Sequence, residues 1–125
     1  MGGYSSPTKT RAHAWVTSTR TVDSTASVNL DQWYIMGQRL VVNGASSRID
    51  AFNCAVDGTV SITQSSTFSY SSPSYAPNEI TIGGRGTSIR GNNDIAAYAL
   101  YKSALTDQEI QDICDELSTR FGNPT

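Results

Sequence analysis

Short apolar runs alternate with turn residues along most of this chain, and this pattern predicts an antiparallel β-protein. Runs of β-branched and aromatic residues bounded by Gly, Pro, Asn, Asp and Ser are typical of strands. The runs expected to form strands are 11–18, 21–30, 33–42, 48–56, 59–64, 79–82 and 94–101. The dipeptides Asn43-Gly44 and Asp57-Gly58 tolerate positive φ, and we expect each of them to form a turn.

Segment 94–101 differs from the other runs because apolar residues fall on both of its faces. This pattern is typical of a strand buried between two layers, so we expect this strand inside the fold. Four aromatic side chains are also expected in the core, namely Trp33, Phe52, Tyr98 and Tyr101.

The stretch 65–78 is less regular, because Pro73 and Pro77 each remove a backbone donor and argue against a central strand. Its aromatic residues are expected either to hold the loop against the body or to bind a ligand. After the next predicted strand, residues 83–86 (Gly-Gly-Arg-Gly) are expected to turn the chain.

One helix is predicted over about 107–120. Thr106 and Glu109 fit a capping box, and Leu105 and Ile110 fit a hydrophobic staple. An apolar stripe at helical spacing is formed by Ile110, Ile113, Cys114, Leu117 and Phe121. The opposite face is polar, so we expect the helix to lie on the body of the domain.

These elements predict an all-β fold, an antiparallel β-sandwich closed by one short C-terminal α-helix. A chain of 125 residues can bury one modest core. We expect residues 1–10 to form a flexible or docked arm and residues 11–125 to form a single sandwich domain.

Several motifs in order resemble the C-terminal part of the concanavalin A-like lectin/glucanase (laminin-G-like) jelly-roll family. The matching residues are Trp33, Val56-Asp57-Gly58, Ile80-Thr81-Ile82-Gly83-Gly84, Ile95 through Leu100-Tyr101, Ala104-Leu105-Thr106 and Glu109-Ile110. The resemblance covers about residues 30–122 and implies a jelly-roll sandwich. Full domains of that family have more strands before the Trp than 32 residues supply. This departure implies either a compact or truncated version of the domain or a sandwich whose sheet edges another copy or another protein completes.

Charge and hydropathy exclude several partners. The net charge is −2, only 16% of residues are charged and no basic cluster is present, so we expect no nucleic-acid partner. No apolar run approaches the roughly 20 residues that span a bilayer, and no secretory signal is recognised, so we expect no membrane partner. The expected location is a virion, or the extracellular space after release.

The candidate reactive residues are few. Cys54 lies in an apolar strand-like run and Cys114 on the apolar helix face, so both are expected to be small buried hydrophobes. A bridge between them stays open, because spacing alone cannot establish it. His13 is the only histidine and has no metal-ligand partner nearby in sequence.

Acidic residues argue against an enzyme. Five of the eleven lie in the predicted helix, and the other six are isolated, whereas glycoside hydrolysis needs paired carboxylates. The chain also lacks a nucleophile elbow and a phosphate-binding loop. We therefore expect no catalytic residues and no cofactor.

Two binding sites are considered. Asp57, Asn92 and Asp94 are weak calcium candidates, since their oxygen atoms suit Ca²⁺, although such residues are also ordinary turn formers. A sugar site would need exposed aromatic rings beside planar polar groups, or else these rings pack in the fold. Its candidate residues are Trp15, Tyr70, Tyr75 and Arg85.

The sequence thus predicts a non-catalytic structural or interaction module, such as a virion decoration, tail or fibre component. Its partners would be other subunits of an assembly or further copies of itself. The alternative is a carbohydrate-binding, lectin-like module with a glycan partner.

Overall fold

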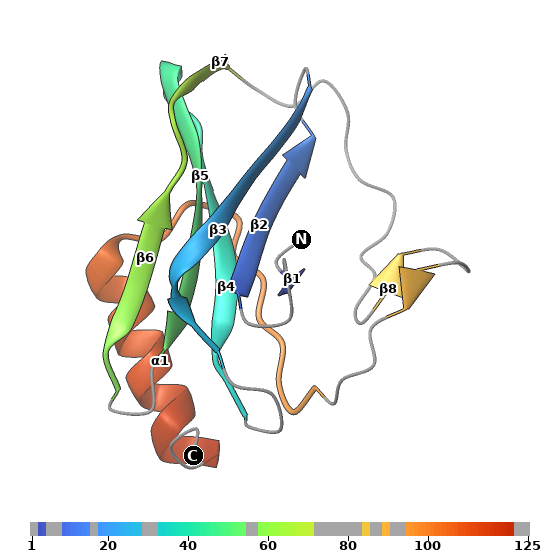
Figure 1. Cartoon of the computed structure of the whole chain (residues 1–125). Helices are drawn as coiled ribbons and strands as arrows, with labels where there is room; N and C mark the ends of the chain where they lie inside the picture. Colours follow the sequence, from blue (N-terminus) through green and yellow to red (C-terminus); the bar gives the residue numbers. More distant parts are fainter. Residues whose placement is uncertain are drawn as a thin grey trace. The chain divides into compact units, whose positions relative to one another are not determined.

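The computed structural model describes residues 3–4, 9–15, 18–28, 33–54, 58–71, 84–85, 89–90 and 95–121. The chain divides into two compact units, which are described separately. The larger unit is Met1–Ser72 with Ser103–Thr125, and the smaller is Pro73–Lys102. The described residues are mostly antiparallel β-structure with one C-terminal helix, which confirms the predicted β-class (Figure 1).

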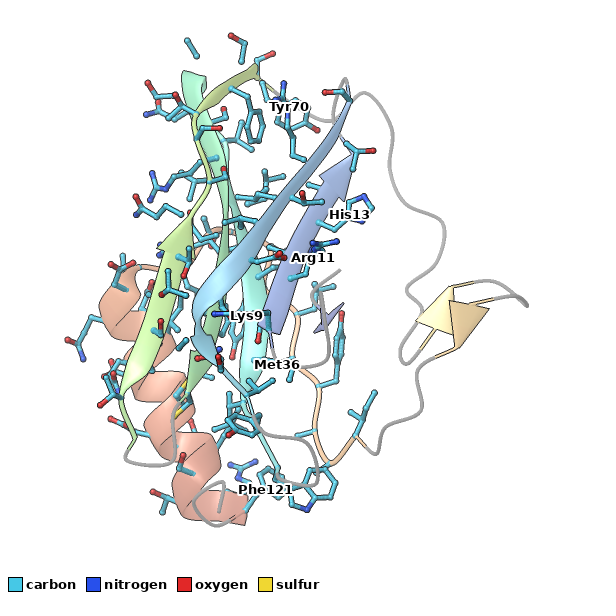
Figure 2. All side chains as sticks on the ribbon, in the orientation of Figure 1. Lys9, Arg11, His13, Met36, Tyr70 and Phe121 are labelled. Carbon is cyan, nitrogen blue, oxygen red and sulfur yellow. The ribbon has the colours of Figure 1, made fainter. Side chains whose placement is uncertain are left out.

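The first sheet of the larger unit has the strand order β1-β2-β3, and both pairings are antiparallel. Its strands are β1 (Gly3–Tyr4), β2 (Lys9–Trp15) and β3 (Thr19–Ser27). The alternation in β2 puts Ala12 and Ala14 into an apolar core and leaves Arg11 and His13 on the outer face (Figure 2). On this outer face Arg11 Nε donates to Asp23 Oδ1 of β3 at 2.7 Å.

The second sheet has the order β4-β5-β6, and a short strand, β7, also pairs with β5. Its strands are β4 (Met36–Val41), β5 (Gly44–Cys54), β6 (Val60–Gln64) and β7 (Phe68–Tyr70). Gly44 has φ 53° and Gly58 has φ 86°, which confirms that the predicted turn glycines need positive φ. The hairpin loop is nevertheless long, because the last β4–β5 pair is Val41 with Arg48.

Strand β5 has two buried faces, and its alternation decides what each face contacts. Ile49 and Ala51 pack with Ala12 of β2 and Phe68 of β7, which joins the two sheets face to face. Side chains on the other face of β5 pack against the helix. Asn53 is a buried polar residue on the inter-sheet side, and its Nδ2 donates to the carbonyl of Ala26 at 3.1 Å. The larger unit therefore has three layers, namely a sheet, a second sheet and a helix.

Helix α1 (Asp107–Phe121) begins at the predicted residue and ends one residue later than predicted. The capping box is confirmed: the Thr106 N–H donates to Glu109 Oε2 at 2.7 Å, and the Glu109 N–H donates to Thr106 Oγ1 at 3.2 Å. The staple is also confirmed, because Leu105 packs into the cluster that contains Ile110. Phe121, by contrast, is exposed at the end of the helix, so the buried part of the apolar stripe stops before it (Figure 2).

One further expectation about the core differs from the structure. Phe52 is half-buried and packs against the helix-side cluster, as expected, but Trp33 is exposed. The reason is that β4 begins only at Met36, so Trp33 precedes the sheet. Phe52 packs over Gly37 of the neighbouring strand, since a Cβ at Gly37 would lie 2.3 Å from Phe52 Cζ.

The smaller unit holds a short ladder of β8 (Gly84–Arg85) and β9 (Ile89–Arg90). Gly84 and Arg85 are thus extended and paired, which corrects the expectation of a turn at these two residues. Residues 95–101 are not a strand, so the strand expected over 94–101 is wrong for this described part. The physical reason is that no described strand pairs with them. Tyr98 and Tyr101 are consequently exposed, and not in the core.

Candidate functional site

Of the four residues proposed for a sugar site, only Tyr70 has a described side chain. Tyr70 ends β7 at one end of the sheets, where its half-buried ring packs against the core that joins them (Figure 2). Its carbonyl accepts a hydrogen bond from Ser47 Oγ at 2.7 Å. For Trp15, at the end of β2, and Arg85, in β8, the backbone alone is described, and Tyr75 lies outside the described residues.

The three calcium candidates, Asp57, Asn92 and Asp94, also lie outside the described residues. Within the described part of the chain, no group of three or more His, Cys, Asp or Glu side chains could hold a metal ion.

The described carboxylates all have polar partners. Seven of the eleven acidic residues are described: Asp23, Asp50, Asp107, Glu109, Asp112, Asp115 and Glu116. Each accepts a hydrogen bond or forms an ion pair within the larger unit. The Thr106 backbone N–H and hydroxyl donate to Glu109 and hold the pKa of that carboxyl below its ordinary value.

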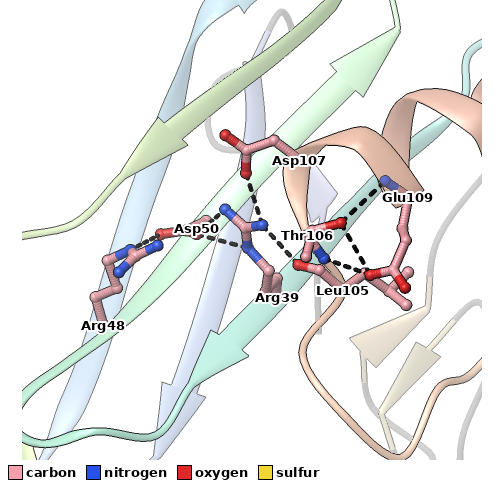
Figure 3. Close-up of polar contacts among 7 residues, drawn as sticks. All are labelled: Arg39, Arg48, Asp50, Leu105, Thr106, Asp107 and Glu109. Carbon is pink, nitrogen blue, oxygen red and sulfur yellow. Dashed lines mark hydrogen bonds and ion pairs between the residues drawn. The ribbon is translucent and has the colours of Figure 1, made fainter.

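Among the described residues, the buried charged side chains are Arg39 and Asp50. They form an ion cluster between the second sheet and the start of α1 (Figure 3). Arg39 of β4 and Asp50 of β5 are directly opposite each other, with side chains 5% and 0% exposed. Arg39 Nε donates to Asp50 Oδ2 at 2.8 Å, and Arg39 Nη2 lies 2.6 Å from the same oxygen. The other Asp50 oxygen accepts from Arg48 Nε at 3.1 Å.

The same guanidinium also holds the beginning of the helix. Arg39 Nη1 donates to the carbonyl of Leu105 and contacts Asp107 Oδ1, each at 2.7 Å (Figure 3). Burial opposes the charge of Arg39, but hydrogen bonds with Asp107 and Asp50 outweigh it and raise the pKa of Arg39 above its ordinary value. Arg39 is therefore a permanent cation that ties the sheet to the helix N-terminus. Since both oxygens of the buried Asp50 carboxylate are bound by arginines, we assign this cluster to folding.

Beneath the helix lie two thiols, Cys54 at the end of β5 and Cys114 on α1. Both are buried and form no disulfide, which confirms that they are small core residues, and a hydrogen bond links their side chains. Burial, followed by the neighbouring Cys54 and Asp115, raises the pKa of Cys114 to about 12. A thiol with this pKa stays protonated at neutral pH and is a poor nucleophile.

The feature most suggestive of an interaction is residues 95–101 of the smaller unit, called here the apolar segment. Its sequence, Ile-Ala-Ala-Tyr-Ala-Leu-Tyr, has no charged residue. Its four large side chains, Ile95, Tyr98, Leu100 and Tyr101, are between 46% and 65% exposed. The apolar pattern was visible in the sequence, but the exposure depends on pairing and was not predicted.

Among the described residues, no helix combines the length and the apolar character needed to cross a membrane. No family model, curated protein or solved structure matches the chain, so its function has to be inferred from the geometry described above.

Proposed function

We propose that this chain is a non-catalytic structural or interaction module that docks onto other protein subunits. The observation that carries the proposal is the apolar segment, in which four large apolar side chains within seven residues are about half exposed or more. Soluble proteins rarely expose contiguous apolar surface unless it contacts a partner. A strand-like segment also has backbone donors and acceptors that a partner strand can satisfy.

The partners of the carboxylates in the larger unit support the same proposal. Hydrolysis by paired carboxylates needs two acids free to exchange protons with a substrate. The seven described carboxylates instead accept hydrogen bonds or ion pairs that stabilise strands and the helix. The two thiols are buried under the helix, away from any substrate.

We also propose that the two sheets belong to a jelly-roll sandwich. The order of motifs resembles the laminin-G-like jelly rolls, and the sheets joined by Ile49 and Ala51 are compatible with a sandwich of that type. A sandwich completed by neighbouring subunits suits a virion decoration, tail or fibre component. Such proteins mount on a larger assembly, and the proposed location is the virion.

The alternative function is carbohydrate binding. The partly exposed ring of Tyr70 at the end of the sheets is the specific observation in its favour, because aromatic faces stack on sugar rings. Its packing against the core, however, already accounts for its position.

The two functions are separated by measuring association and glycan binding on the same purified chain. Sedimentation velocity over a wide concentration range should show reversible association, and a glycan array should give no signal. A chain that stays monomeric throughout and binds glycans, with the binding lost in Tyr70→Ala, would refute the docking function and establish the carbohydrate alternative.

A further inference from the structure

We propose that the apolar segment is the docking element and that its partner is the same segment of a second copy. The two segments would pair as antiparallel strands around a two-fold axis at Tyr98. This inference rests on the proposed function and names the partner for it.

The backbone of the apolar segment favours pairing with another strand. Residues 95–101 are assigned to no strand, and no described strand pairs with them. Their apolar residues alternate onto both faces, which is the pattern of a strand covered on two sides. Because an unpaired segment exposes its backbone donors and acceptors, pairing with another strand satisfies these groups and brings the apolar side chains of the two strands into cross-strand contact.

The side chains of the segment are also complementary to those of a second copy. In an antiparallel pair centred on Tyr98, that residue faces its own copy. The flanking pairs are then Ile95 with Tyr101, Ala96 with Leu100, and Ala97 with Ala99. Large residues meet aromatic or small ones, and aromatic pairs and pairs of an aromatic with a β-branched residue are among the favourable cross-strand combinations.

Charge and symmetry also favour a second copy as the partner. The segment has no Lys, Arg, Asp or Glu, so two copies meet without like-charge repulsion, and no charge steers a different, charged partner to it. An isologous two-fold contact closes on itself, and it is the commonest symmetry of soluble oligomers.

The size of the contact sets its expected strength. Stable interfaces bury about 1,200–2,000 Å² in total, and a ladder of two seven-residue strands is smaller than that. We therefore expect a reversible dimer whose population depends on protein concentration. In an assembly that concentrates many copies, the same contact would be populated more fully.

The register is tested by cysteine cross-linking in the full chain. In the proposed ladder the two copies of position 98 are directly opposite, with Cα atoms about 4.5–5.5 Å apart, which is within reach of a disulfide. Ala96 lies on the same face, but its two copies are four residues apart along the ladder, roughly 13 Å. Tyr98→Cys should therefore form a covalent dimer under mild oxidation, whereas Ala96→Cys and the parent chain should not.

A charge variant tests the same contact without oxidation. Tyr98→Lys places two like charges opposite each other and should abolish concentration-dependent association in sedimentation velocity. Its matched control is Thr19→Lys, which adds the same charge at an exposed position on β3 and should associate like the parent. Circular dichroism of each variant should match that of the parent, which shows that the fold is kept.

Two results would overturn the inference: equal cross-linking of Tyr98→Cys and Ala96→Cys, or normal association of Tyr98→Lys. Either result would leave the proposed function standing, with a different docking surface. A parent chain that is monomeric at every concentration and binds glycans would refute the proposed function itself.

Discussion

Replacing Asp50 by Asn should strongly destabilise the larger unit, because it removes the charge that balances two arginines. The Asp50 side chain is fully buried, and the side chain of its partner Arg39 is only 5% exposed. Removing one partner of such a pair leaves an uncompensated buried charge, which typically costs about 3–5 kcal/mol. Because Arg39 keeps its contacts with Asp107 and the Leu105 carbonyl, we expect the lower end, about 3 kcal/mol.

The matched control is Asp107→Asn, which removes the other carboxylate bound to Arg39. The Asp107 side chain is 69% exposed, so solvent screens this contact, and its loss should cost about 1 kcal/mol or less. The two substitutions make the same chemical change on partners of the same guanidinium. A larger loss in Asp50→Asn therefore reports the burial of Asp50 together with its second contact, with Arg48.

Urea unfolding followed by circular dichroism measures both variants. For a slope of about 1–3 kcal/mol per molar urea, a loss of about 3 kcal/mol lowers the midpoint by about 1–3 M. Since domains are stable by only about 5–15 kcal/mol, Asp50→Asn should be close to unfolding in dilute buffer at elevated temperature. The reasoning is refuted if Asp50→Asn moves the midpoint no further than Asp107→Asn. The double variant Arg39→Met/Asp50→Leu should recover much of the loss, because no buried charge is left.

Three further outcomes are expected. Thr106→Ala should lower the free energy of unfolding by about 1 kcal/mol, because the helix loses its cap, whereas Thr106→Ser should keep it. Equal melting temperatures of the parent and Thr106→Ala would contradict the capping geometry. Gly37→Ala should cost about 1–3 kcal/mol in urea unfolding because the new methyl collides with the Phe52 ring, and the double variant Gly37→Ala/Phe52→Leu should lose less than the sum of its single changes. Burial raises the pKa of Cys114 from 9.0 to about 12, so its contribution to stability is complete below pH 9 and is lost as pH rises toward 12. Cys114→Ala should therefore lose stability less steeply across that interval, and parallel pH curves for the two proteins would argue against a buried, protonated thiol.

Local patterns predicted the elements whose determinants are close in sequence. The helix start follows from Thr106 and Glu109, which are three residues apart and satisfy each other's backbone donors. The positive φ of Gly44 and Gly58 follows from the turn dipeptides that contain them. In both cases the deciding contacts lie within one element or one turn, so composition and spacing contain the needed information.

The hairpin register shows why the ion cluster could not be predicted. A two-residue turn at Asn43-Gly44 would place Arg39 opposite Arg48, which brings two like charges together. The structure instead has a longer loop, in which Ser47 Oγ accepts the Asn43 N–H at 2.8 Å and β7 pairs with the start of β5. Arg39 then faces Asp50. The cluster thus depends on a non-local strand, and no spacing rule within the hairpin identifies it.

The candidate sites also depend on contacts that are distant in sequence. Aromatic and oxygen-bearing residues in turns could be recognised as types, but the exposure of an aromatic side chain depends on which strand lies beside it. Tyr98 illustrates this point, because the alternation around it predicted a buried strand, whereas the side chain is 52% exposed. The apolar pattern was recognised correctly, but no described strand of the chain covers it.

We therefore expect stability and association to depend on different residues of this protein, and the variants should separate them. The ion cluster is buried between sheet and helix, so Asp50→Asn should lower the urea midpoint while molecules that remain folded still associate like the parent. The apolar segment has no described strand pairing and contributes little to the core, so Tyr98→Lys should abolish association while the midpoint measured on dilute protein stays unchanged. If both variants lowered stability and association together, folding and docking would depend on one cooperative structure, and the segment would have to be regarded as part of the core.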